Sequence, residues 1–364
     1  MNDSFMKGLE LSSLFYEQAV RPILAGHFAQ LKYSAGLMGP GSEVLGFDTP
    51  QSMDHDWGPR LMLFVSEADH ETSQREIEQV LGAELPGAFY AYPTNFGEHE
   101  DGTRVMAASE GGPTHHGVTV HTVAGYFRQM LNFDPAGKMR AVDWLSVPEY
   151  CLLMLTAGRV FYDGLGQLEP MRARLRYYPD EIWLYLLAAQ WRRIAQEEAF
   201  VGRCGQAGDD LGSRLVAARL VGDLMRLCFL MERKYAPYIK WLGSAFGQLA
   251  CAREMMPMLR QVLEGGSWEV REAHLARAYT MAAEMHNGLG ITAPLTTEVS
   301  LFYKRPFLVI HAERFVDAIR GAIQSEEVRA LPEHLGSVDQ FIDSTDAGRY
   351  LERLRGVYEE ARAA

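Results

Sequence analysis

Two aspartates separated by one residue, Asp54 and Asp56, stand just ahead of the apolar run Leu61 to Val65. Side chains two residues apart in a strand point to the same face, so a strand here would place two carboxylates side by side. A bound cation offsets the repulsion between such like charges. Ligand sets made of oxygen alone suit Mg2+ better than zinc. Asp54 and Asp56 are therefore the predicted metal ligands and catalytic acids.

A Gly-Ser pair, Gly41 and Ser42, precedes Asp54 by eleven intervening residues. The backbone N–H groups of such a turn and the serine hydroxyl are donors that can hold a phosphate. Arg60, at the start of the apolar run, either reaches a phosphate or only shapes the strand. His55 faces away from the two acids in an extended segment, and we expect a structural role for it.

The order Gly-Ser, a spacer of this length and Asp-x-Asp resembles the signature of the DNA polymerase β-like nucleotidyltransferase superfamily. The sequence looks most like the uncharacterised bacterial family DUF4037 in the stretches Gly41-Ser42, Leu45-Gly46-Phe47-Asp48 and Ser52-x-Asp-His-Asp-Trp-Gly-Pro-Arg60. The resemblance implies an α+β fold, with a nucleotidyltransferase-like mixed β-sheet domain followed by an all-α helical bundle. It also implies Mg2+ or Mn2+ at the acid pair and a nucleoside triphosphate, expected to be ATP, as the donor.

The length and net charge of the chain limit the number of domains and the kinds of partner that can be expected. A chain of 364 residues exceeds a comfortable single core and favours two domains. A formal net charge of −12 argues against a nucleic-acid substrate, because binding a phosphate backbone needs a basic face. A small-molecule or protein acceptor is expected instead. No apolar run is long enough for a membrane span and no signal-peptide pattern is visible, so we expect a cytoplasmic protein.

Turn residues cluster between Asn132 and Pro148, where the pattern changes to helical. We therefore predict an α/β domain over 1–143 and a helical bundle over 144–364. In the first domain we expect one helix over Ser4 to Leu31, or two meeting near Pro22, and strands at 33–37, 60–65 and 117–124. Helices are expected at 72–81 and 126–131, with a long irregular excursion over 84–116. In the second domain, helices are expected near 147–160, 180–200, 211–234, 243–263, 270–287, 300–323 and 345–361.

Related nucleotidyltransferases usually take a third carboxylate from a later strand beside the first two. The matching strand here, 118–123, has no acid, and Thr119 or His121 occupies its place. His121 could serve as ligand or base, or make a structural hydrogen bond. Some antibiotic-modifying members use a second-domain carboxylate as base, which makes Glu197 and Glu198 candidates. An ion pair between Arg193 and Glu197 is the alternative explanation for the first of these.

Two further stretches of the helical domain carry a resemblance, the first to a segment of DUF4037 members and the second to a segment common in two-domain members of the superfamily. The stretch Lys234 to Trp241 combines Lys234 and Lys240 with three aromatic residues. It could clamp a triphosphate and stack a base, or form a corner between helices. The stretch Arg159 to Gln167 is either a strand-like turn after the first helix of the bundle or a glycine-rich helix stop.

The predicted activity is transfer of a nucleoside monophosphate from a nucleoside triphosphate to a hydroxyl or similar nucleophile. A divalent ion would polarise the reacting phosphorus and neutralise developing charge. The missing third acid favours an alternative, a catalytically degenerate nucleotide-binding or regulatory protein of the same fold. A third possibility, an antitoxin-like or scaffold protein, needs neither metal nor nucleotide.

Overall fold

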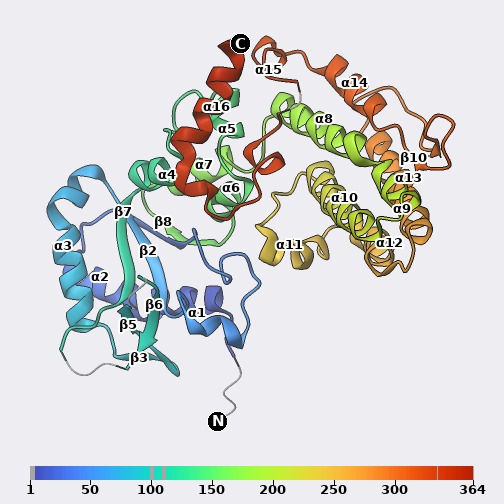
Figure 1. Ribbon diagram of the computed structural model, residues 1–364. Coiled ribbons are helices and arrows are strands. Elements are labelled where there is room, and N and C mark those ends of the chain that lie inside the picture. Colours follow the sequence, from blue (N-terminus) through green and yellow to red (C-terminus); the bar gives the residue numbers. More distant parts are fainter. Residues whose placement is uncertain (1–4, 99–101, 109–111, 334, 364) are drawn as a thin grey trace. The chain divides into compact units, whose positions relative to one another are not determined.

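The computed structural model describes residues 5–98, 102–108, 112–333 and 335–363 (Figure 1). Ser4, the expected start of the first helix, lies outside these residues. The chain forms two compact units. Unit 1 consists of Met1–Lys138 and Cys151–Arg176, and unit 2 consists of Met139–Tyr150 and Tyr177–Ala364. The chain therefore passes from one unit to the other three times.

A four-stranded mixed sheet organises unit 1, with the strand order β7-β2-β1-β8. β1 (Tyr33–Leu37) pairs antiparallel with both β2 (Arg60–Val65) and β8 (Arg159–Asp163), and β7 (Gly117–Thr122) pairs parallel with β2. The ranges of β1, β2 and β7 follow the sequence prediction closely. Of the two alternatives for Arg159 to Gln167, the structure shows the strand, β8. The helix predicted at 147–160 is therefore shorter and forms α6 (Glu149–Thr156).

One face of this sheet carries the main apolar core of unit 1. Alternate residues of the strands point into it and pack against α1 (Gly8–Phe15), the π-helical turn η1 (Tyr16–Val20), α2 (Arg21–His27) and α3 (Glu67–Glu84). Pro22 lies in the first turn of α2, directly after the π-helical turn η1. The core includes Leu11, Phe15, Ala35, Leu61, Leu63, Ile77, Leu81, Val118 and Val120.

The predicted irregular excursion over 84–116 is wrong in part, because short strands form within it. β3 (Ala88–Phe89) pairs with β4 (Tyr92–Pro93), and β5 (Asn95–Glu98) pairs with β6 (Arg104–Ala107). Residues 99–101 and 109–111 lie outside the described part of the chain. After β7, α4 (Val123–Leu131) ends at Asn132 in a left-handed conformation, and α7 (Leu168–Arg174) follows β8.

Unit 2 is mainly helical (Figure 1). Its helices are α5 (Ala141–Leu145), α8 (Asp180–Glu197), α9 (Phe200–Gln206), α10 (Asp210–Met231), α11 (Ile239–Phe246), α12 (Ala252–Glu264), α13 (Trp268–Gly288), α14 (Glu313–Ala322), α15 (Glu326–Arg329) and α16 (Leu351–Ala363). The predicted fold class, a mixed sheet with helices followed by a helical bundle, is confirmed.

One predicted helix of unit 2 is wrong over half its length. Residues 300–323 form a hairpin of β9 (Ser300–Leu301) and β10 (Leu308–Val309), followed by α14. Pro306 cannot continue a helix, and Tyr303 and His311 adopt positive φ values of 55° and 53°.

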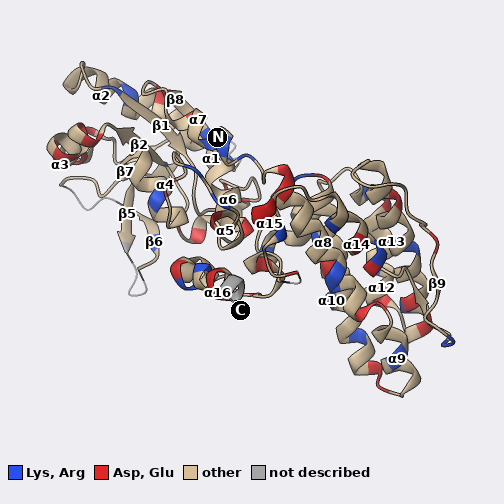
Figure 2. Cartoon of the chain, turned by 90° about the horizontal axis from the view of Figure 1, so that it is seen from above, with Lys and Arg blue, Asp and Glu red and all other residues tan. Residues whose placement is uncertain are grey.

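Aromatic stacking and mixed charge characterise unit 2. Trp191 of α8 stacks on Phe315 of α14 with a centroid separation of 4.2 Å. Acidic and basic residues are interspersed along its helices (Figure 2). Among the described residues, no helix combines the length and the apolar character that crossing a membrane requires.

Glu149 is a buried acid in unit 2. Its backbone N–H donates to Asp339 Oδ2 at 2.7 Å, and its own Oε1 has no hydrogen-bond partner among the described residues. Burial, and secondarily the neighbouring Asp339, raise the pKa of Glu149 to about 8. Arg226 and the Ala236 amide oppose the shift. Between its ordinary pKa of 4.5 and this raised pKa, Glu149 is protonated in the folded protein and ionised in the unfolded chain.

This proton uptake predicts a pH dependence of stability. Glu149 should favour the folded state below its ordinary pKa of 4.5, and the contribution should fade as the pH rises toward 8. Glu149→Gln should therefore flatten the decline in the free energy of unfolding between pH 5 and 8, measured by urea denaturation. Because burial also raises the pKa of Asp339, part of the slope should remain. Exposed Glu352→Gln is the control, and an unchanged slope in Glu149→Gln would contradict the prediction.

Candidate functional site

The Gly-Ser pair forms a tight turn directly after β1. Gly39 and Gly41 adopt φ values of 88° and 139°, which favour glycine. The Gly39 N–H donates to the Met154 carbonyl at 2.8 Å. A Cβ on Gly41 would collide with the Arg60 guanidinium and lie 2.6 Å from Glu43 Oε2. The Ser42 hydroxyl makes no hydrogen bond within the described residues and so remains available to a ligand.

Arg60 is held beside this turn by Glu43, a residue that the sequence interpretation missed. Arg60 Nε donates to Glu43 Oε1 at 2.7 Å, and Arg60 Nη2 donates to the Pro40 carbonyl at 2.7 Å. The Glu43 side chain is 1% exposed and that of Arg60 is 18% exposed. The structure thus brings the predicted phosphate contacts Gly41 and Arg60 together. The position of Glu43 beside the Gly-Ser pair was the one signal in the sequence.

The predicted strand geometry of the acid pair is wrong. Asp54 ends a 3-10 helix, η2 (Pro50–Asp54), and Asp56 adopts φ 46°, so both acids precede β2 in an exposed loop. The Asp56 N–H donates to the Arg104 carbonyl at 2.7 Å, and Asp54 Oδ1 lies 2.9 Å from His55 Nδ1. The loop bends here because the following Trp57 is buried, stacked at 5.5 Å on Phe5.

A second buried acid, Asp48, closes this acid-bearing loop. Asp48 Oδ2 accepts hydrogen bonds from the Gly8 N–H at 2.7 Å and from Trp57 Nε1 at 3.1 Å, and Lys7 pairs with the same carboxylate. The ends of segment 49–56 are therefore tied together at Asp48 and Trp57. Asp48 is 1% exposed, which makes it a structural acid rather than a free ligand.

β7, the strand beside β2, carries Thr119 and His121, the two residues predicted at the position of a third carboxylate. Met62 pairs with Thr119 in the parallel register, so Thr119 and His121 share the sheet face opposite the main core. His121 Nε2 lies 2.9 Å from Thr119 Oγ1. Burial, with a smaller effect of His70, lowers the pKa of His121, so the imidazole is neutral at pH 7. A neutral imidazole can accept a proton.

Tyr126 connects this face to the Gly-Ser turn. Its ring centroid lies 5.2 Å from that of His121, and a Cβ on Gly39 would lie 2.5 Å from its hydroxyl. The Tyr126 hydroxyl is buried without a hydrogen-bond partner among the described residues. No pattern in the sequence indicated that Tyr126 would lie beside the Gly-Ser turn.

The candidate acids of unit 2 are both engaged in structural contacts. Glu197 pairs with Arg219 at 2.7 Å, while Arg193 pairs with Asp223 at 2.8 Å, so the suggested pair of Arg193 with Glu197 is not the one formed. Glu198 accepts hydrogen bonds from the Ile310 and Ala312 N–H groups at 2.9 and 3.3 Å. Burial raises the pKa of Glu198 to about 7, against the effect of these amides.

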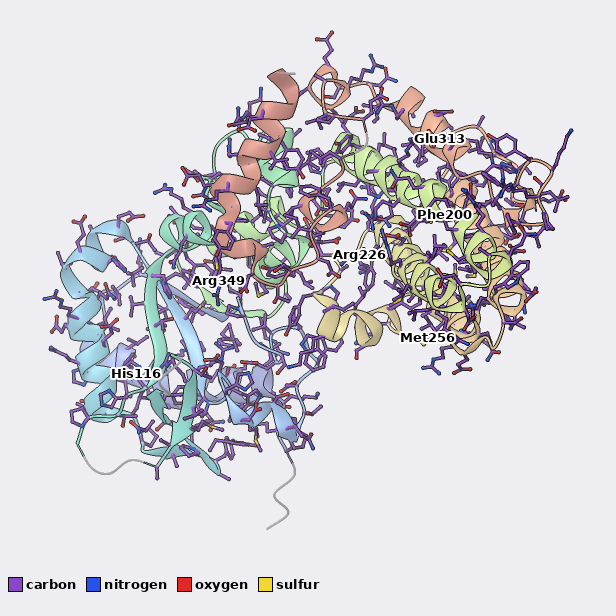
Figure 3. The ribbon with its side chains drawn as sticks, viewed as in Figure 1. His116, Phe200, Arg226, Met256, Glu313 and Arg349 are labelled. Atoms are coloured by element: carbon purple, nitrogen blue, oxygen red, sulfur yellow. The ribbon has the colours of Figure 1, made fainter. Side chains whose placement is uncertain are left out.

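Lys234 and Lys240 are exposed on unit 2, with Lys240 Nζ 5.1 Å from the centroid of a Trp241 ring. Neither lysine lines the two adjoining hollows of 700 and 340 Å³ that share Arg226 of α10 (Figure 3). Asp339 and Asp343 line the same hollows, so their charge is mixed. This part of unit 2 shows no clear preference for an anion.

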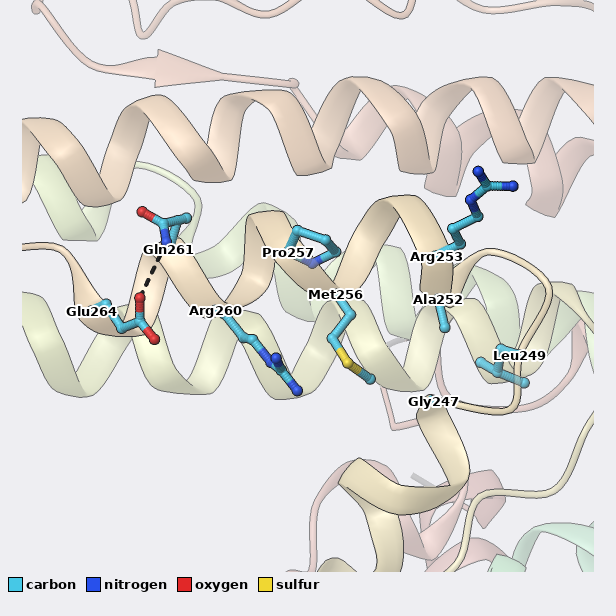
Figure 4. Close-up of a pocket in the computed structure, with 9 residues that line it drawn as sticks. All are labelled: Gly247, Leu249, Ala252, Arg253, Met256, Pro257, Arg260, Gln261 and Glu264. Atoms are coloured by element: carbon cyan, nitrogen blue, oxygen red, sulfur yellow. Dashed lines mark hydrogen bonds between the residues drawn. The ribbon is translucent and has the colours of Figure 1, made fainter.

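A third hollow, of 630 Å³, runs along α12 (Figure 4). Arg253 and Arg260 lie on either side of Met256, and Leu249 and Gly247 border it. None of the predicted site residues lines it. Among the described residues, no group of three or more His, Cys, Asp or Glu side chains is placed to hold a metal ion.

Comparisons with known proteins agree with part of the predicted resemblance. Residues 144–242 match the family model DUF4037, a domain of unknown function, which confirms the resemblance to that family. No curated protein matches the chain. A solved structure of a nucleotidyltransferase-like protein from Exiguobacterium sibiricum 255-15 aligns with 84% of this chain and 76% of that chain, at 15% identity and a TM-score of 0.29. An alignment at that TM-score supports no conclusion about the site.

The different surroundings of the acids predict different effects of mutation on stability. Asp48→Ala should lower the free energy of unfolding by about 3 kcal/mol, because buried donors lose a charged acceptor. Asp54→Ala should change it by less than about 0.5 kcal/mol, because the side chain is 67% exposed. Urea denaturation of both variants tests the contrast. Similar losses in both would show that the acid-bearing loop is not anchored at Asp48.

Proposed function

We propose that the chain binds a nucleoside triphosphate at the Gly41-Ser42 turn and transfers its nucleoside monophosphate group to a hydroxyl or similar nucleophile of a small molecule or protein. The observation that carries the proposal is the clustering of the glycine turn with Arg60. The turn offers backbone N–H groups and the Ser42 hydroxyl, and Arg60 offers guanidinium donors. These are the groups that bind phosphate oxygens. The DUF4037 match of residues 144–242 supports the family context, not the activity.

The acid pair fits a divalent ion by the chemistry of its donors. Mg2+ is commonly held by one or two carboxylates together with substrate phosphates and water. Asp54 and Asp56, both exposed, would supply the two carboxylates for Mg2+ or Mn2+. Such an ion would supply positive charge that offsets the negative charge developing on the phosphates. Gly41 and Ser42 would orient the phosphates, and His121, being neutral, would accept the proton of the acceptor hydroxyl.

One observation favours a second candidate function. Thr119 stands where a third carboxylate is expected, and its hydroxyl is close enough to His121 for a hydrogen bond. A protein with this arrangement could bind a nucleotide without turning it over, as a regulatory protein. Pyrophosphate release measured with each nucleoside triphosphate and Mg2+ or Mn2+, together with nucleotide-binding titration, separates the two functions. Transfer predicts pyrophosphate release that requires an acceptor, whereas a regulatory protein predicts binding alone.

Nucleotide affinity should depend on a divalent cation held by Asp54 and Asp56. The double variant Asp54→Asn and Asp56→Asn should lose metal-dependent binding of ATP, because uncharged amides hold Mg2+ poorly. Its fold should persist, since both side chains are exposed. Calorimetric titration with and without Mg2+ tests this, with circular dichroism as the control for folding. Equal ATP affinity with and without the cation in the unmutated protein would contradict the prediction.

If His121 is the base, the pH profile of turnover should report it. Because burial lowers the pKa of His121, the acidic limb of kcat should lie below the ordinary histidine value of 6.5. His121→Gln should slow kcat and remove this limb with little change in ATP affinity. An unchanged profile in the variant would exclude His121 as the base.

If the unmutated protein is inactive, gain of transfer in Thr119→Asp would indicate a degenerate metal site.

A further inference from the structure

Glu43 was not among the predicted site residues. The structure buries its side chain almost fully, directly beside the Gly-Ser turn. Its Oε1 receives Arg60 Nε at 2.7 Å and Arg60 Nη2 at 2.5 Å, while its Oε2 has no hydrogen-bond partner among the described residues. With 1% of its side chain exposed, Glu43 cannot meet a ligand itself. Any effect of Glu43 on binding must therefore pass through its neighbours, Arg60 and the backbone of the turn.

Arg60 is held in one orientation by three contacts. Nε and Nη2 are used by Glu43 and by the Pro40 carbonyl, whereas Nη1 makes no hydrogen bond within the described residues. A guanidinium is planar, so fixing Nε and Nη2 also fixes the direction in which Nη1 presents its two N–H groups. Because 18% of the Arg60 side chain is exposed, part of it remains open to a ligand.

The backbone of the turn is pressed against this ion pair. A side chain at Gly41 would collide with Arg60 Nη2 and with Glu43 Oε2. Burying both charges is costly, and a hydrophobic pair of similar volume often stabilises a fold equally well. The pair therefore has no clear advantage for stability alone. Its geometric result is an arginine fixed beside the N–H groups and hydroxyl of Gly41 and Ser42.

We propose that Glu43 is a positioning residue that aims Arg60 at the β- and γ-phosphates bound by the Gly41-Ser42 turn. The ligand chemistry is that of a linear polyphosphate, and its identity as a nucleotide rests on the proposed function. Arg60 supplies charge and paired donors, Gly41 supplies close approach of the backbone, and Glu43 prevents Arg60 from turning away. The competing explanation is that the pair only fastens the turn to β2.

A double-mutant cycle separates positioning from fastening. Calorimetry measures the affinities of ATP, inorganic tripolyphosphate and adenosine for Arg60→Gln, Glu43→Gln and the double variant, below the unfolding temperature of each. Each single substitution should weaken ATP and tripolyphosphate about tenfold, the effect of losing one charge-assisted hydrogen bond, and adenosine hardly at all. The double variant should be no weaker than Arg60→Gln, because Glu43 acts only through Arg60.

Asp48→Asn is the matched control, since Asp48 is equally buried but contacts Gly8 and Trp57 instead of Arg60. It should reduce stability without a selective loss of polyphosphate affinity. If Glu43→Gln lowers stability but leaves the affinity for tripolyphosphate unchanged, the pair is a fastener and the proposal is overturned. Should Glu43→Gln fail to fold, Glu43→Asp decides in the same assay, because a shorter acid draws Arg60 back, and full affinity in it overturns the proposal.

The outcomes for this proposal and for the transfer activity are distinguishable. Polyphosphate binding that requires Glu43 and Arg60, without pyrophosphate release from any nucleotide, supports the positioning role and refutes transfer. Transfer that neither substitution affects supports the enzyme and refutes the positioning role. Absence of both ATP and tripolyphosphate binding in the unmutated protein refutes both.

Discussion

The requirement that a buried carboxylate must have partners shapes the segment between β1 and β2. Glu43 and Asp48 are each 1% exposed, and an unpaired charge at such a position would cost several kcal/mol. Glu43 meets this requirement with Arg60 at the start of β2. Asp48 meets it with the N–H of Gly8 at the start of α1 and with the indole of Trp57. Two acids thereby join the turn, the acid-bearing loop and the first helix to the sheet.

This arrangement divides the acids of the segment by function. Glu43 and Asp48 are buried and hold partners inside the protein, whereas Asp54 and Asp56 remain exposed within a loop whose ends are tied together. An exposed acid pair on an anchored loop retains freedom to adjust its oxygens around an ion, which a strand position would restrict. The departure of Asp54 and Asp56 from strand geometry is therefore compatible with the proposed role in metal binding, although it changes how the carboxylates would be presented.

The sequence predicted the elements whose pattern is local. β1 and β2 are apolar stretches bounded by turn residues, and their ranges agree with the structure. β8 was left open because Arg159 to Asp163 is short and polar at both ends, and its pairing with β1 spans more than a hundred residues. The bend at Asp56 was missed because it depends on the burial of Trp57 against Phe5, a contact that no local pattern reveals.

The same distinction holds for the candidate site. Gly41 and Ser42 were selected from their spacing to Asp54, and Arg60 was left as either a phosphate contact or a residue that shapes the strand. The structure places Gly41 and Arg60 in close proximity. Glu43 and Tyr126 were missed, because a glutamate beside Gly-Ser usually lies in an exposed turn and a tyrosine at the start of a helix usually packs in the core. Only the tertiary structure shows that the Glu43 carboxylate is buried against Arg60 and that the Tyr126 hydroxyl faces Gly39.

We propose that a nucleotide and a divalent ion bind together in unit 1, the nucleotide at Gly41-Ser42 and the ion at Asp54 and Asp56. The most direct test is a crystal structure with Mn2+ and a non-hydrolysable ATP analogue, in which anomalous scattering locates the ion. We expect an anomalous peak within coordination distance of both aspartate carboxylates and of a phosphate oxygen, with the terminal phosphates on the Gly41-Ser42 turn. A peak elsewhere, or a triphosphate bound away from this turn, would contradict the account.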